Sequence, residues 1–184
     1  MKKFIPLILV LVLIAGMLVS TYNKVMVLDE NVDQAWAQVE NTLKRRADLI
    51  PNLVNTVKGY AGHEKDVLTE VTNARSSMNN ASTPEEYAKA NEEMNQALKS
   101  INVVVEAYPE LKADTNFQNL QAELAGTENR IAVERKRYNE TVGKYNRAVR
   151  RFPTSIMAGM MGFDKRQYFE ISEAEAEVPT VNFE

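Results

Sequence analysis

The sequence predicts an all-α protein, in which one N-terminal transmembrane helix continues into an elongated antiparallel helical bundle with a partly irregular C-terminal tail. Large apolar residues recur at steps of three and four along most of the chain, which is the spacing of one helix face. No stretch shows the apolar–polar alternation that a half-buried strand would need. Glycine and proline are scarce, with 7 and 6 among 184 residues, so few positions interrupt a helix.

The N-terminal part is long and apolar enough for a membrane span. After Lys2 and Lys3, residues 4–23 form a run of 20 residues without a charge. Such a run makes about 30 Å of helix, close to the thickness of one bilayer core. The apolar residues expected to face lipid are Phe4, Ile5, Leu7, Ile8, Leu9, Val10, Leu11, Val12, Leu13, Ile14, Leu18 and Val19.

A cleaved signal peptide is the alternative, because the strongly apolar part, residues 4–19, is shorter than a typical span. The segment after Val19 has no small-x-small cleavage site close to the apolar run, and it continues directly into the next apolar stripe. Both features favour an uncleaved anchor. The alternative product would be an exported soluble binding protein.

The flanking charges predict the orientation of the span. Lys2 and Lys3 precede it, whereas Lys24 follows it with Asp29 and Asp33 close behind. The positive-inside rule then favours a cytoplasmic N-terminus and a bundle outside the cytoplasmic membrane. A cytoplasmic bundle is the alternative orientation.

The first bundle helix follows the span without a break. One step in its apolar stripe is seven residues long and passes over Arg45 and Arg46. We expect a kink near Ala47–Pro51, because a proline inside a helix removes one hydrogen bond, and a helix stop at Gly62. The stripe is Val25, Leu28, Val32, Trp36, Val39, Leu43, Ile50, Leu53 or Val54, and Val57.

Three more helices complete the expected bundle. The second covers about residues 64–78. The third begins with Thr83 as cap, Pro84 at the first helical position and Glu86 placed to reach back to the cap. Pro109 ends or interrupts it. The fourth begins at Asp114 or Thr115 and closes at Phe152-Pro153. We therefore divide the chain into an anchor (1–23), a bundle (24–153) and a tail (154–184).

The tail begins with a run rich in methionine, residues 156–163, and ends in an acidic stretch. It either docks its aromatic side chains on the bundle or forms an exposed patch for a partner or for membrane, since methionine-rich surfaces adapt to many partners. Together with basic and polar residues of the first bundle helix, the candidate interaction residues are Arg45, Arg46, Asn52, Met157, Met160, Met161, Phe163, Tyr168 and Phe169.

The composition argues against an enzyme. The chain has no cysteine and a single histidine, His63, so thiol chemistry and the usual histidine-based metal or acid–base sites are missing. We expect no catalytic residue, cofactor, metal or small-molecule substrate. Without Lys2 and Lys3 the chain carries 20 basic and 25 acidic residues, which disfavours nucleic acid. The basic clusters at 44–46, at 135–137 and around Arg147 are either solvated charge or a patch for anionic lipid or an acidic partner.

Two long motifs resemble the LemA family of bacterial membrane proteins. The first is AWAQVENTLKRRADLIPNLVNTVKGYAGHE at residues 35–64. The second combines YNRAVR (145–150), FP (152–153), GF (162–163), YF (168–169) and VPTVNF (178–183). The resemblance implies a single N-terminal transmembrane helix, an all-helical antiparallel bundle and no established enzymatic activity. Relatives of this kind have been linked to membrane biogenesis, including that of magnetosome membranes.

The resemblance also bears on anchoring and orientation. Some members of the family look like lipoproteins, but Met17 stands here where the modified cysteine would be. Family descriptions have at times placed the short N-terminus outside the cell, opposite to the orientation that the charges favour. Arg45, Arg46, Pro51 and Asn52 belong to the family's central motif, which serves either folding or binding.

These observations predict a non-enzymatic, single-pass, membrane-anchored scaffold or interaction protein in membrane or envelope organisation. Its expected partners are the lipid bilayer through the N-terminal helix, further copies of the same chain, and an envelope protein.

Overall fold

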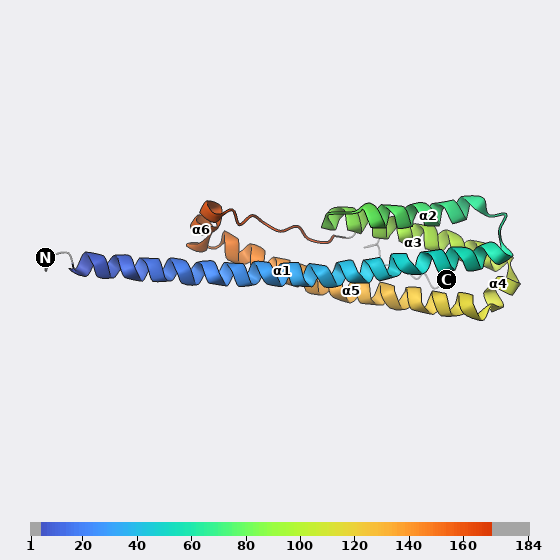
Figure 1. The fold of residues 1–184 in the computed structure, drawn as a ribbon, viewed down its shortest axis with the longest axis horizontal. Coiled ribbons are helices and arrows are strands. Elements are labelled where there is room, and N and C mark those ends of the chain that lie inside the picture. Colours follow the sequence, from blue (N-terminus) through green and yellow to red (C-terminus); the bar gives the residue numbers. More distant parts are fainter. Residues whose placement is uncertain (1–4, 171–184) are drawn as a thin grey trace, which may run out of the picture. The chain divides into compact units, whose positions relative to one another are not determined.

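The computed structural model describes residues 5–170, and the chain there is helical without a strand (Figure 1). This confirms the predicted all-α class. Phe4 of the expected span, the acidic stretch and the VPTVNF motif lie outside the described residues. The six helices are α1 (Ile5–Tyr60), α2 (Lys65–Asn80), α3 (Pro84–Ala107), α4 (Pro109–Ala113), α5 (Thr115–Arg150) and α6 (Thr154–Met161).

The contacts divide the chain into two compact units, and α1 and α5 each contribute to both. The span unit combines α1 up to Ala37 with Lys136–Gln167. The bundle unit combines Gln38–Arg135 with the described residues after Gln167, Tyr168–Glu170. The expected division into an anchor (1–23), a bundle (24–153) and a tail (154–184) has other boundaries and stays a prediction.

In the span unit, the first part of α1 carries exposed apolar side chains. Within the described residues, α1 is the one helix that is long and apolar enough to cross a membrane. From Val25 onward its side chains become buried at helical spacing, first Val25, then Val32 and Ala35. Trp36 packs on Tyr138 of α5, with ring centroids 5.2 Å apart. The buried face of α5 in this unit consists of Tyr138, Val142, Tyr145, Asn146 and Val149.

The bundle unit buries the apolar stripes that the sequence indicates. Its core draws side chains from the second part of α1, from α2, α3 and α4, and from the first part of α5. Burial of this kind stabilises the unit by roughly 25 cal/mol for each Å² of apolar surface removed from water. The core residues include Ile50, Leu53, Val57, Val71, Met94, Ala97, Ile101, Leu111, Phe117 and Leu124.

Most helix boundaries follow from local chemistry. The α3 N-terminus is the expected capping box: Thr83 Oγ1 accepts from the Glu86 amide at 3.2 Å, and the Glu86 carboxylate accepts from the Thr83 amide at 3.1 Å. The chain leaves α1 close to Gly62, where an added Cβ would lie 2.9 Å from the Lys58 carbonyl oxygen. Pro51 lies inside α1, which remains one helix on both sides of it.

Two short helices were not expected. α4 begins at Pro109, because a proline is well tolerated in the first turn of a helix, and it places Leu111 in the bundle core. α6 occupies part of the segment that the sequence assigns to an irregular tail. Its C-terminus is closed by Gly162, which adopts a φ of 75° that side chains disfavour.

Candidate functional site

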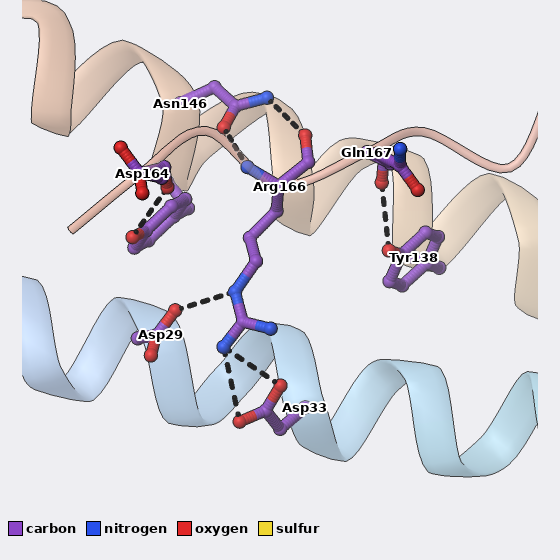
Figure 2. Close-up of polar contacts among 8 residues, drawn as sticks. Asp29, Asp33, Tyr138, Asn146, Asp164, Arg166 and Gln167 are labelled. Atoms are coloured by element: carbon purple, nitrogen blue, oxygen red, sulfur yellow. Dashed lines mark hydrogen bonds and ion pairs between the residues drawn. The ribbon is translucent and has the colours of Figure 1, made fainter. Parts of the chain in front are cut away.

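The segment that follows α6, residues 163–167, is held by side chains of α5 in the span unit (Figure 2). It begins where the Phe163 amide donates to the Ala158 carbonyl oxygen at 3.0 Å, which completes the turn at Gly162. The Phe163 ring then packs beside Tyr22 of α1, with centroids 5.9 Å apart. We call residues 163–167 the strap.

The strap has no regular secondary structure, so side chains satisfy its backbone polar groups (Figure 2). The Asn146 amide bonds both backbone groups of Arg166: its nitrogen donates to the carbonyl at 2.9 Å, and its oxygen accepts from the amide at 2.9 Å. Tyr145 donates to the Asp164 carbonyl at 2.9 Å, and Tyr138 donates to the Gln167 carbonyl at 2.8 Å. Three side chains on one face of α5 thus fix the path of the strap.

The Arg166 side chain ties the strap to α1. Its Nε donates to Asp29 at 2.9 Å, and its Nη2 lies 3.1 Å from the Asp33 carboxylate (Figure 2). Asp29 and Asp33 are four residues apart and therefore share a helix face. The hydrogen bond to Asp29 raises the pKa of Arg166 further, so the guanidinium stays charged. Asp29 and Asp33 together neutralise the charge of Arg166, which lies more than 130 residues later in the sequence.

The two tyrosines act as hydrogen-bond donors over the whole physiological pH range. Burial raises the pKa of Tyr138 to about 12. Burial also raises the pKa of Tyr145, and the nearby Asp29 carboxylate adds to this shift. Both phenols therefore keep their protons and can donate hydrogen bonds to the strap carbonyls.

The methionine-rich candidates lie on α6 and are unequally exposed. Met160 is 83% exposed and Met161 is also exposed, whereas Met157 is half-buried. Phe163 is half-buried beside Tyr22. The exposed part of α6 is the apolar surface that the sequence indicates for a partner or for membrane.

The two aromatic candidates after the strap belong to the bundle unit and differ from each other. Tyr168 is exposed, whereas Phe169 is only 1% exposed. Phe169 is therefore part of the protein interior, and Tyr168 is the one of the pair that a partner could reach.

The arginines of the central motif separate in the same way. Arg45 is exposed, but Arg46 is 3% exposed and lies inside the bundle unit. Arg46 Nη1 donates to Asn91 at 2.7 Å and Nη2 donates to Asn95 at 2.6 Å, and the guanidinium pairs with Glu128 of α5. A buried charge needs such partners, since desolvating it alone would cost several kcal/mol.

Arg46 thus links three helices of the bundle, α1, α3 and α5, and its side chain is used inside the fold. The sequence contains a signal for this burial. The apolar stripe has its one seven-residue gap between Leu43 and Ile50, and Arg46 occupies the position in the gap that continues the stripe. Asn52, the third polar candidate of the motif, is exposed.

Within residues 5–170, no group of three or more His, Asp or Glu side chains is arranged to hold a metal ion. His63 is exposed at the turn between α1 and α2.

The described residues form a helical bundle that is preceded by one N-terminal candidate membrane helix. This combination defines the class of protein as a helical bundle with an N-terminal apolar helix. Comparison with known families identifies the particular one. The LemA family model matches residues 35–183, so the chain belongs to the LemA family, as its two motifs predict.

Three curated relatives show the range of the similarity. Magnetosome protein MamQ 2 of Paramagnetospirillum magneticum is 22% identical over 179 residues, which cover 83% of this chain and 66% of the relative. Magnetosome protein MamQ of Magnetospirillum gryphiswaldense is also 22% identical, with 83% and 65% covered. Protein LemA of Metamycoplasma hominis is 23% identical over 158 residues, with 85% and 72% covered. The chain spans just under two thirds of the length of the magnetosome proteins.

Proposed function

We propose that this LemA-family chain is a non-enzymatic, single-pass membrane-anchored scaffold in membrane or envelope organisation. The observation that carries the proposal is the continuity of α1. The apolar span and the buried stripe of the bundle are parts of one helix, Ile5–Tyr60, without a flexible linker between them. The similarity to proteins named as magnetosome proteins supports a role at a membrane.

The proposed location is the bacterial cytoplasmic membrane, with the N-terminus in the cytoplasm and the bundle outside. The two lysines before the span support this orientation. An envelope protein is then the expected protein partner. The absence of cysteine and the single, exposed His63 support a non-enzymatic role.

The anchor is tested by measuring whether the chain keeps its N-terminal residues and stays in the membrane. We expect the intact mass of the purified protein to include residues 1–23, and we expect the protein to remain in the pellet after extraction at alkaline pH. A mature protein that lacks about the first twenty residues and is released in soluble form would replace the scaffold by an exported binding protein.

Self-association is part of the proposal. The apolar stripes of the bundle are covered within one chain, so a contact between copies would use the exposed span or the exposed face of α6. Because the chain has no cysteine, the single variant Ile156→Cys reports on the α6 face, and Val103→Cys on the bundle unit is its control. Disulfide-linked dimers of Ile156→Cys in native membranes, without dimers of the exposed bundle variant Val103→Cys, would support a contact through α6. A chain that stays monomeric under general crosslinking in detergent contradicts self-association.

A further inference from the structure

A basic cavity lies in the span unit where the uncharged run of α1 ends. Its volume is about 310 Å³. Lys24, the first charged residue after the run, lines it together with Thr21 on α1, Arg147 on α5, Arg151 in the following turn, and Thr154 at the start of α6. The cavity therefore brings together three cations and two hydroxyl groups from three separate helices and a turn.

Among the described residues, no acidic side chain lines the cavity beside these three cations. Among the residues that the structure describes, Lys24, Arg147 and Arg151 form no salt bridge, whereas Arg166 in the same unit is paired with two aspartates. Three like charges around one hollow repel each other, and an anion in the cavity would relieve that repulsion. Arginine and lysine side chains donate charge-assisted hydrogen bonds, so a cluster of them is suited to a phosphate group.

The position of the cavity along α1 indicates where the phosphate comes from. Residues 4–23 are uncharged, and Lys24 follows directly. If the run lies in the hydrocarbon core, the residues just after it lie among the lipid headgroups, where the phosphates of the bilayer are. Thr21 and Lys24 are at that level, and the arginines reach it from α5.

An apolar stripe on and before α6 lies next to the cavity. Phe152, Ile156 and Met160 are spaced by four residues and are 76%, 59% and 83% exposed, while Ala158 on the same helix is buried. Thr154, the first residue of α6, lines the cavity, so the start of this helix is beside the cavity. Exposed apolar side chains beside cationic ones are the composition of a helix that lies in a membrane interface.

We propose that the cavity binds the phosphate of an anionic membrane lipid, while Phe152, Ile156 and Met160 insert into the same leaflet. The proposal rests on the membrane anchoring of α1 in the proposed function. The lipid would then hold α5 and α6 against α1 at the membrane surface. The leaflet is the one on the C-terminal side of the span, whichever side of the membrane that is.

Lipid binding to the full-length chain tests the cavity. Native mass spectrometry of the detergent-purified protein is carried out with added phosphatidylglycerol or phosphatidylcholine, and with inorganic phosphate alone. We expect phosphatidylglycerol to bind about ten-fold or more tightly than phosphatidylcholine, because each of several cations near the membrane surface favours an anionic headgroup. Binding of inorganic phosphate as tight as that of the lipid would overturn the assignment to a lipid.

Charge-matched variants locate the site. The triple variant Lys24→Gln, Arg147→Gln, Arg151→Gln should lose the preference for phosphatidylglycerol. The control triple variant Lys58→Gln, Lys99→Gln, Arg130→Gln removes the same charge from exposed positions of the bundle unit and should keep it. Equal loss in both variants would show that net charge, not the cavity, attracts the lipid, and would contradict the proposal.

The α6 face has its own measurement. A fluorophore that is sensitive to polarity, attached at Met160→Cys in vesicles containing phosphatidylglycerol, should shift to the blue and be quenched by quenchers carried on lipid chains. The same label at Val103→Cys, which is 74% exposed in the bundle unit, should remain in water. A water-exposed label at position 160 would contradict the insertion of α6. If the protein resists alkaline extraction but shows neither effect, the further inference fails and the anchor stands.

Discussion

Arg45 and Arg46 are neighbours in the sequence with opposite environments, and they provide a matched test of the central motif. Replacing Arg46 by Met leaves Asn91 and Asn95 without their buried donor, which we expect to lower the free energy of unfolding by about 1–3 kcal/mol. Arg46→Lys should also destabilise, because one ammonium group cannot reproduce the fork that contacts two amides and Glu128. Arg45→Met should change stability by about 0.5 kcal/mol or less, as for most exposed positions.

Denaturation of the full chain in detergent micelles, followed by circular dichroism, measures these differences. Equal stability of the Arg45 and Arg46 variants would show that Arg46 does not hold the bundle together. If the Arg46→Met protein is as stable as the parent but no longer functions in cells, the central motif serves binding and not folding.

Asn146 contacts the strap through its side-chain amide, so its replacement should loosen the strap and leave the bundle core unchanged. Asn146→Ala removes two hydrogen bonds to the Arg166 backbone, which weakens the closed strap by about 1–3 kcal/mol. We expect amide hydrogen exchange of residues 164–167 to become roughly ten-fold faster or more, while the bundle core exchanges as before. Lys144→Ala, an exposed change on the same helix, is the control. Unchanged exchange in Asn146→Ala would contradict this role.

At the scale of elements, the α3 capping box is the clearest case in which local sequence decides a boundary. Thr83→Ala removes the acceptor of the Glu86 amide and should cost about 1 kcal/mol of stability, the usual value for the loss of a cap. Thr83→Ser keeps the hydroxyl and should stay near the parent protein. Thermal denaturation of the two variants side by side provides the measurement. If alanine and serine are equally stable, the cap contributes nothing to the fold.

The elements also show which parts of the fold the sequence can predict. α2, α3 and α5 were predictable because each has an apolar face at helical spacing and a polar or proline boundary. α6 was not, because its eight residues are apolar nearly all round and contain Gly159, so no periodicity distinguishes a helix from a tail. The strap was not predictable either. Its partners Tyr138, Tyr145 and Asn146 lie on one face of α5, but nothing in their spacing indicates that they bond the backbone of residues 164–167.

The same limit applies to the candidate interaction residues. Met160 and Tyr168 are exposed, and their role in an interaction stays a prediction. Arg46 is buried by contacts with side chains more than 40 residues away in the sequence. Phe169 is buried as well, although it follows the strap near the end of the described residues. Long-range contacts of this kind are not visible in local patterns.

At the scale of the whole molecule, the absence of cysteine makes the orientation of the bundle directly measurable. A single thiol at Val103→Cys is exposed in the bundle unit, and the parent chain supplies no other thiol. If Lys2 and Lys3 keep the N-terminus in the cytoplasm, a maleimide that cannot cross membranes should label this thiol in intact cells or spheroplasts. Lysed cells should be labelled in either orientation and provide the control.

Protection of Val103→Cys until lysis would reverse the orientation. The cationic cavity would then face the cytoplasmic leaflet, whose anionic lipids give it a negative surface potential. Labelling from outside would instead require the anionic lipid in the outer leaflet of the cytoplasmic membrane. The orientation experiment thus decides which leaflet should be altered to test the lipid site in cells, and the affinity for phosphatidylglycerol in vitro should be the same in both cases.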